Sequence, residues 1–168
     1  MASVGEALDQ PGPNGTPASL QAARRLVARA LAESGPASAQ TDHGLADALQ
    51  RACALVLRNI QEAMGDDGRD ALLDRAAFKS ETLHPVVRQL RDPGTPGISR
   101  EQLSAAVAAD SMAARAGIEA LLASLIETLA RLIGEDMALH IIARDADGNL
   151  DREASRGAQP PDSGGAVS

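Results

Sequence analysis

The stretch Ile98-Ser99-Arg100-Glu101-Gln102-Leu103 carries the strongest helix start in the sequence. Ser99 and Gln102 have the spacing of a capping box, in which each side chain accepts a hydrogen bond from the other residue's backbone N–H. Ile98 and Leu103 stand at the two positions of a hydrophobic staple. These two devices together predict a helix that begins at Arg100.

A broad apolar face follows this start. Its members recur at spacings of three and four residues, the period of one helix face: Ile118, Leu121, Leu122, Leu125, Ile126, Leu129, Leu132, Ile133 and Met137. Asp110 and Ser111 offer a second N-cap, which divides the stretch into predicted helices over about 100–109 and 112–135. Residues 137–143 fit both helical and extended periods, and we favour a helix there.

Cap and turn residues divide the chain before Ile98 into further helices. The predicted ranges are about 17–34, 42–64, 69–79 and 82–91. Gly35 and Gly65 are each placed to end a helix. Residues 66–68 form a predicted turn, Thr82 is the predicted N-cap of the last of these helices, and Phe78 is expected to close the end of the helix before it.

These elements predict an all-α fold: a small bundle of about four to six helices with a long C-terminal helix and disordered termini. Residues 16–144 form the predicted bundle domain. Residues 1–15 and 145–168 are rich in Gly, Pro and polar residues, so they cannot bury enough apolar surface to offset the entropy of ordering. We therefore expect a disordered arm and a disordered tail.

The composition disfavours several classes of partner. Phe78 is the only aromatic residue, so neither an aromatic-lined cofactor pocket nor a base-stacking platform can be built, and we predict no cofactor. The net charge of −7 disfavours phosphate backbones and anionic membranes, and we expect no nucleic-acid partner. Fifteen of the 16 basic residues are arginine, a bias typical of a GC-rich bacterial genome.

Cys53 is the only cysteine, which rules out an intramolecular disulfide and a cysteine metal cluster. It falls on the apolar face of its helix and is predicted to be a small buried hydrophobe. The N-terminus lacks a basic region followed by an apolar segment, and charged residues interrupt the apolar face at 118–137. We expect a cytoplasmic protein with no membrane span.

Two local patterns bear on metal and phosphate chemistry. Residues 145–153 look like part of an EF-hand calcium loop, but that frame lacks the glycine at position 6 and the glutamate at position 12. We therefore predict a solvated turn and no metal site. His43, His84 and His140 fall in different predicted elements without a metal-ligand spacing. His84 and His140 are the candidate functional residues, because histidine is the group that a helical phosphotransfer module would use.

The sequence favours a non-catalytic interaction or regulatory protein of the adaptor type. We expect its long helix to bind a protein partner or a second copy, because the apolar face is broader than one short bundle needs. The candidate interface residues are Leu121, Leu122, Leu125, Ile126, Leu129, Ile133 and Met137. Leu121, Ile126 and Met137 are expected on the flanks of this face, outside the core.

Two other functions remain open from the sequence. The first alternative is a sensory or histidine phosphotransfer bundle in bacterial signalling. The second is an enzyme whose site converges from separate helices. The enzyme ranks last, because the chain contains no phosphate-binding loop, nucleophile elbow or metal motif.

Overall fold

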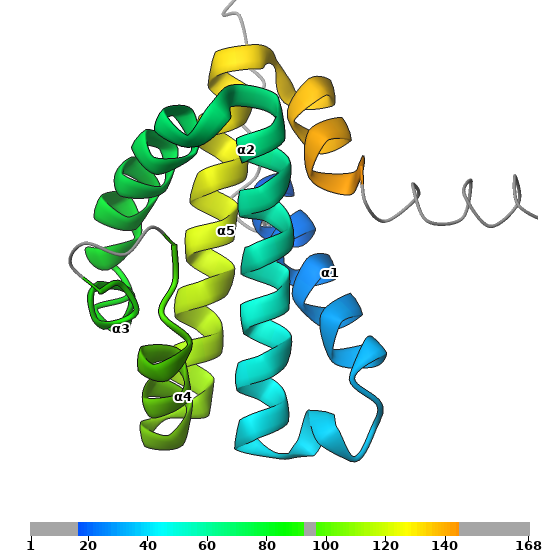
Figure 1. The fold of residues 1–168 in the computed structure, drawn as a ribbon, viewed down its shortest axis with the longest axis vertical. Helices are drawn as coiled ribbons and strands as arrows, with labels where there is room; N and C mark the ends of the chain where they lie inside the picture. Colours follow the sequence, from blue (N-terminus) through cyan, green and yellow to red (C-terminus); the bar gives the residue numbers. More distant parts are fainter. Residues whose placement is uncertain (1–16, 93–96, 145–168) are drawn as a thin grey trace, which may run out of the picture.

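The computed structural model describes residues 17–92 and 97–144, and the regular structure within these ranges is helical (Figure 1). In chain order the elements are α1 (Ala18–Glu33), the short 3₁₀ helix η1 (Ser38–Gln40), α2 (Asp42–Glu81), α3 (Val86–Gln89), α4 (Arg100–Ala109) and α5 (Ser111–Ile133). Residues 135–144 are helical as well. The predicted all-α bundle is confirmed.

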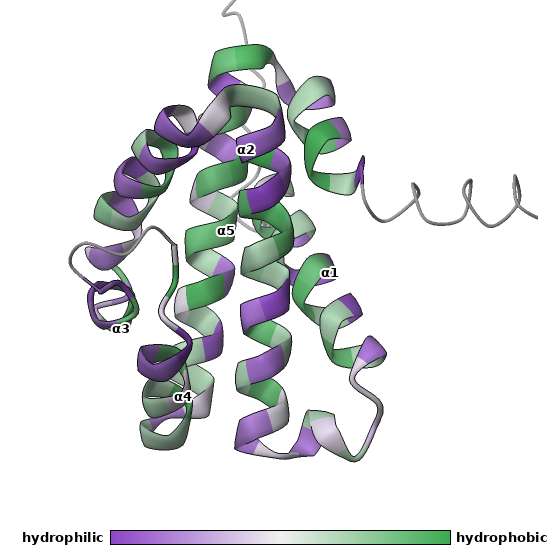
Figure 2. Cartoon of the chain, in the orientation of Figure 1, coloured by the Kyte–Doolittle hydropathy of each residue, from purple (hydrophilic) through white to green (hydrophobic). Residues whose placement is uncertain are grey.

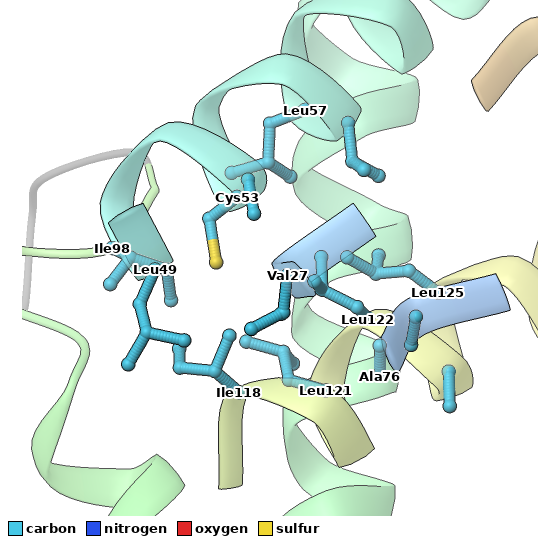
Figure 3. Packing of buried hydrophobic residues seen from close by; sticks show 14 of the residues in the cluster. Val27, Leu49, Cys53, Leu57, Ala76, Ile98, Ile118, Leu121, Leu122 and Leu125 are labelled. Atoms are coloured by element: carbon cyan, nitrogen blue, oxygen red, sulfur yellow. The ribbon is translucent and has the colours of Figure 1, made fainter. Parts of the chain in front are cut away.

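Helices α2 and α5 are the two central elements, because α1, α3 and α4 each pack against both and the two pack against each other; Ile118–Leu129 of α5 supplies many of the buried residues. Figure 2 shows hydrophobic residues along most of the length of α5, as expected for a helix that is covered from several sides. Ile118, Leu121 and Leu122 of α5 are each 0 % exposed. In Figure 3 they lie in one cluster with Val27 of α1 and Leu49 of α2, so the core is assembled from aliphatic side chains.

Helix α2 bends sharply at Gly65. This residue has φ 79° and ψ 179°, a backbone conformation that glycine adopts and that L side chains rarely do. The predicted break at Gly65 is confirmed, but the predicted turn over 66–68 is wrong. One non-helical residue redirects the axis, and the helix resumes at once and continues to Glu81. Both halves of α2 therefore bury apolar residues against the same core.

The predicted helix over 82–91 is also wrong at its start. Thr82 is the C-cap of α2, and the following helix, α3, covers only Val86–Gln89 with Pro85 as its N-cap. The reason is local: the N–H groups of Leu83 and His84 donate to the carbonyl oxygen of Ser80, at 3.2 and 2.8 Å. These bonds tighten the last turn of α2, so residues 82–85 form its exit.

The caps around α4 and α5 follow the sequence closely. Ser99 Oγ accepts from the Gln102 N–H at 3.4 Å, and Asp110 Oδ1 accepts from the Ala113 N–H at 3.0 Å. The Ser99 N–H donates to the Leu90 carbonyl oxygen at 2.9 Å instead of to the Gln102 side chain. The capping box is therefore half formed, and its second bond goes to the preceding segment.

The chain turns at Gly134 and runs back along the bundle. Gly134 has φ 91° and ends α5 at Ile133, two residues before the predicted end. The predicted helix over 137–143 is confirmed within the helical range 135–144. Ala138 and Ile142 of this segment are 0 % and 3 % exposed, and Asn59 Nδ2 of α2 donates to the Ile142 carbonyl oxygen at 3.2 Å. The segment is thus packed onto the core.

Several sequence predictions concern residues outside the described ranges. They are the arm at 1–15, the tail at 145–168 and the calcium-loop pattern at 145–153. The fold therefore neither supports nor opposes them. Among the helices of residues 17–92 and 97–144, none has the length and apolar character needed to cross a membrane.

Candidate interaction groove

The predicted interface residues occupy two different environments. Leu121, Leu122, Leu125, Ile126 and Leu129 are between 0 % and 2 % exposed. The expectation that Leu121 and Ile126 lie outside the core is therefore wrong, because α1 and α2 both pack along α5 and cover its flanks. Ile133 and Met137 are 38 % and 53 % exposed at the turn between α5 and the last helical segment. Of the predicted set, these two remain available to a partner.

A groove of about 530 Å³ lies over the part of α5 that its neighbours leave open. It is bounded by the start of α1, by the exit of α2, and by the helical segment 135–144. The lining residues are Pro17, Ala18, Ser19, Leu20, Arg24, Leu83, His84, Ala116, Glu119, Ala120, Ala123, Ser124, Ile126, Glu127, Ala130, Glu135 and Leu139. Segments far apart in the sequence thus build one concave surface.

Alanines of α5 lie on the floor of the groove, and its exposed lining holds two large leucines together with charged residues such as Glu135. Ala116, Ala120 and Ala130 of α5 are half-buried on the floor. On the rim, Leu83 is 80 % exposed and Leu139 is 36 % exposed. Small residues let another backbone approach closely, and exposed leucines offer apolar area to whatever approaches. The shape suits an apolar side chain or a helix better than a small polar ligand.

Two carboxylates of α5 anchor the neighbouring helices at the groove. Glu119, with a side chain only 10 % exposed, accepts from Arg24 Nε of α1 at 3.4 Å and from Arg115 Nε at 2.9 Å. Glu127 accepts from Lys79 Nζ of α2 at 2.5 Å and from Arg131 at 2.9 Å. The hydrogen bond from Lys79 lowers the pKa of Glu127. Each carboxylate thus has two cationic partners, which leaves both clusters with a surplus of positive charge.

Polar atoms under the floor are already paired. Ser80 of α2 lies 3.0 Å from Ser124 of α5, between the two hydroxyl oxygens, and both residues are buried. Within the described residues, the buried side-chain atoms without a partner are Gln50 Oε1, Asn59 Oδ1 and Arg91 Nε, all of which belong to residues outside the groove lining. Among the described residues, the lining of the groove thus contributes no unpaired buried side-chain atom.

The candidate histidines lie apart. His84 is half-buried on the groove rim, whereas His140 is exposed and does not line the groove. No side chain among the described residues hydrogen-bonds either imidazole, and the described residues contain no group of three His, Cys, Asp or Glu able to hold a metal ion.

Cys53 is 1 % exposed, as predicted, and burial raises its thiol pKa to about 12. It is a core residue.

Sequence reasoning missed Leu83, the most exposed large apolar side chain of the groove. It sits in the exit of α2, where a helix was predicted, so its exposure could not be read from a helical period. The sequence signal for this exit is Pro85, because a proline disfavours the helical conformation of the residue before it, here His84.

Comparison with protein-family models, with curated proteins and with solved structures finds no match for this chain.

Proposed function

We propose that this chain is a non-catalytic interaction or regulatory protein of the adaptor type, which binds a protein segment in the groove over α5. The observation that carries the proposal is the groove itself, with its alanine floor and its exposed leucine rim. The partner is another protein or a second copy of the chain. The arginine-rich composition and the single, buried cysteine support a bacterial cytoplasmic setting.

Energetics support the groove as the binding surface. Covering a fully exposed leucine contributes about 1.5–3 kcal/mol. Leu83, at 80 % exposure, comes near this case, and Leu139, at 36 %, contributes less. The axes of packed helices lie about 8–10 Å apart, and small residues at the contact allow the shorter distances. A partner helix laid on Ala116, Ala120 and Ala130 could also contact Leu83 and Leu139, which is the helix-in-groove mode of recognition.

Photo-crosslinking tests this proposal directly. We place benzoylphenylalanine at Leu83 on the groove rim and, as the matched control, at Phe78, which is 78 % exposed and does not line the groove. In cells of the source organism we expect an adduct with a second polypeptide from position 83 and none from position 78. Adducts at both positions, or no intermolecular adduct at position 83, would overturn the proposal. The adduct's mass tells a second copy from another protein.

The position of His84 keeps phosphotransfer as a second candidate function. Its imidazole lies on the groove rim, within reach of a protein bound there, and is not engaged by another described side chain. Incubation with acetyl phosphate should then give an acid-labile adduct that His84→Ala abolishes and His140→Ala leaves intact. An unmodified wild-type chain would remove this candidate.

A further inference from the structure

The helix over residues 135–144, which we call the return helix, is joined to α5 by one non-helical residue, Gly134 (Figure 1). This glycine has φ 91° and ψ 153°. Its N–H donates to the Ala130 carbonyl oxygen of α5 at 2.8 Å, and its carbonyl oxygen accepts from the Ala138 N–H of the return helix at 3.0 Å. A change in the two backbone angles of Gly134 therefore redirects the return helix and leaves α5 intact.

Few buried side chains hold the return helix to the bundle. Ala138 and Ile142 are 0 % and 3 % exposed, and Ile141 is partly buried against the core. The remaining residues of this helix are exposed, among them Met137 at 53 % and Leu139 at 36 %. A segment with few buried apolar side chains opens at a lower free energy than the core does.

The polar contacts add little to this attachment. Asn59 Nδ2 of α2 donates to the Ile142 carbonyl oxygen at 3.2 Å. Asn59 is 3 % exposed, and its Oδ1 has no hydrogen-bond partner in the described part of the chain. A buried acceptor without a partner costs free energy that hydration returns, so undocking relieves this penalty. The ionisable side chains of the return helix form no ion pair within the described ranges: Glu135, Asp136, His140 and Arg144.

A helix of this length is not stable in water by itself, so the return helix unfolds when it leaves the bundle. We infer that it opens about Gly134 as a cooperative unit while the rest of the bundle stays folded. Glu135 and Leu139 line the groove, and opening removes this wall and uncovers the Ala130 end of the floor. Its effect on partner access rests on the proposed function, whereas the opening itself is a property of the fold.

Native-state hydrogen exchange in the full chain tests the inference. We expect the protection factors of the amides of residues 138–142 to lie within about tenfold of one another and at least roughly a hundredfold below those of residues 121–129. Low concentrations of urea should speed the exchange of α5 and leave that of the return helix nearly unchanged. The reason is that undocking exposes far less surface than unfolding of the bundle.

Two matched substitutions separate this opening from global unfolding. Ile142→Val weakens the attachment of the return helix and should speed the exchange of residues 138–142 roughly two- to tenfold. Ile118→Val makes the same change in the core, at a residue that is 0 % exposed. It should speed the exchange of residues 121–129 by a similar factor and leave that of residues 138–142 unchanged, because the core around Ile118 stays packed when the return helix opens.

Three results would overturn the inference. In the first, Ile118→Val speeds the exchange of residues 138–142 as much as that of α5, so that the return helix opens only with the bundle. In the second, Ile142→Val leaves residues 138–142 unchanged. In the third, protection declines steadily from residue 138 to residue 142, which is fraying of a helix end. The proposed function fails on a different result, the lack of an intermolecular adduct at position 83, so the two failures are distinguishable.

Discussion

At the scale of single residues, Cys53 illustrates how burial controls chemistry. Its side chain is 1 % exposed among aliphatic neighbours, and loss of hydration raises the pKa of the thiol to about 12 (Figure 3). The thiolate, which is the reactive form, is therefore scarce at neutral pH and also out of reach.

We predict that Cys53 does not react with Ellman's reagent at pH 8 while the protein is folded. Its labelling rate should match the rate of global unfolding and become rapid only in denaturant. An Ala108→Cys variant, at an exposed position of α4, provides the control, with one fast and one protected thiol expected. Rapid labelling of the wild-type chain under native conditions would contradict this prediction and would show that the core opens locally.

Phe78 shows the limit of residue-level prediction. Its position near the end of the second half of α2 suggested that it would close the helix against the core, yet its side chain is 78 % exposed. A helical period identifies which residues share a face, but whether another element covers that face depends on the tertiary arrangement. Ala76 and Ala77 of the same turn are buried instead, both at 0 % exposure.

At the scale of elements, the features that could be predicted are the ones set by neighbouring residues. Asp110 caps α5 and Gly35, at φ 83°, follows α1, both as the sequence indicates. Each depends on hydrogen bonds within one turn of the helix. The sequence did not indicate that the second bond of the capping box, from the Ser99 N–H to the Gln102 side chain, would be absent. The Ser99 N–H donates instead to the carbonyl oxygen of Leu90, nine residues earlier.

The ion pair between Lys79 and Glu127 joins two helices that are 48 residues apart in sequence, with 2.5 Å between Nζ and Oε2. The hydrogen bond from Lys79 lowers the pKa of Glu127, so folding favours the ionised carboxylate. This stabilisation is complete above the ordinary glutamate pKa of about 4.3 and is lost as the pH falls through the lowered value. Both side chains are partly solvated, so the contribution is less than about 1 kcal/mol.

We predict that Glu127→Gln lowers the free energy of unfolding at pH 7, and that the difference from wild type is smaller at pH 3. Urea unfolding at both pH values measures it. Glu62→Gln, at an exposed position of α2, should show little difference at either pH. A gap between wild type and Glu127→Gln that is just as large at pH 3 would mean that the carboxylate charge is not responsible.

At the scale of the whole molecule, the candidate site could not be predicted from sequence. Helical periodicity marked α5 as the most apolar helix, but it assigned residues such as Leu121 and Ile126 to an interface when they belong to the core. The sharp bend at Gly65 brings the second half of α2 back over α5, and residues 135–144 return along the bundle. The paths of these two segments determine which part of α5 is left uncovered, and no local sequence pattern encodes them.

The last prediction concerns the folding unit. The described core contains residues from Ala23 to Ile142, so we expect a fragment of residues 16–145 to fold on its own. Circular dichroism should show the same number of helical residues as the full chain and a single cooperative thermal transition. Removal of the residues outside 16–145 should lower the midpoint by several degrees at most. A large loss of helicity, or a transition that is no longer cooperative, would show that the removed segments complete the core itself.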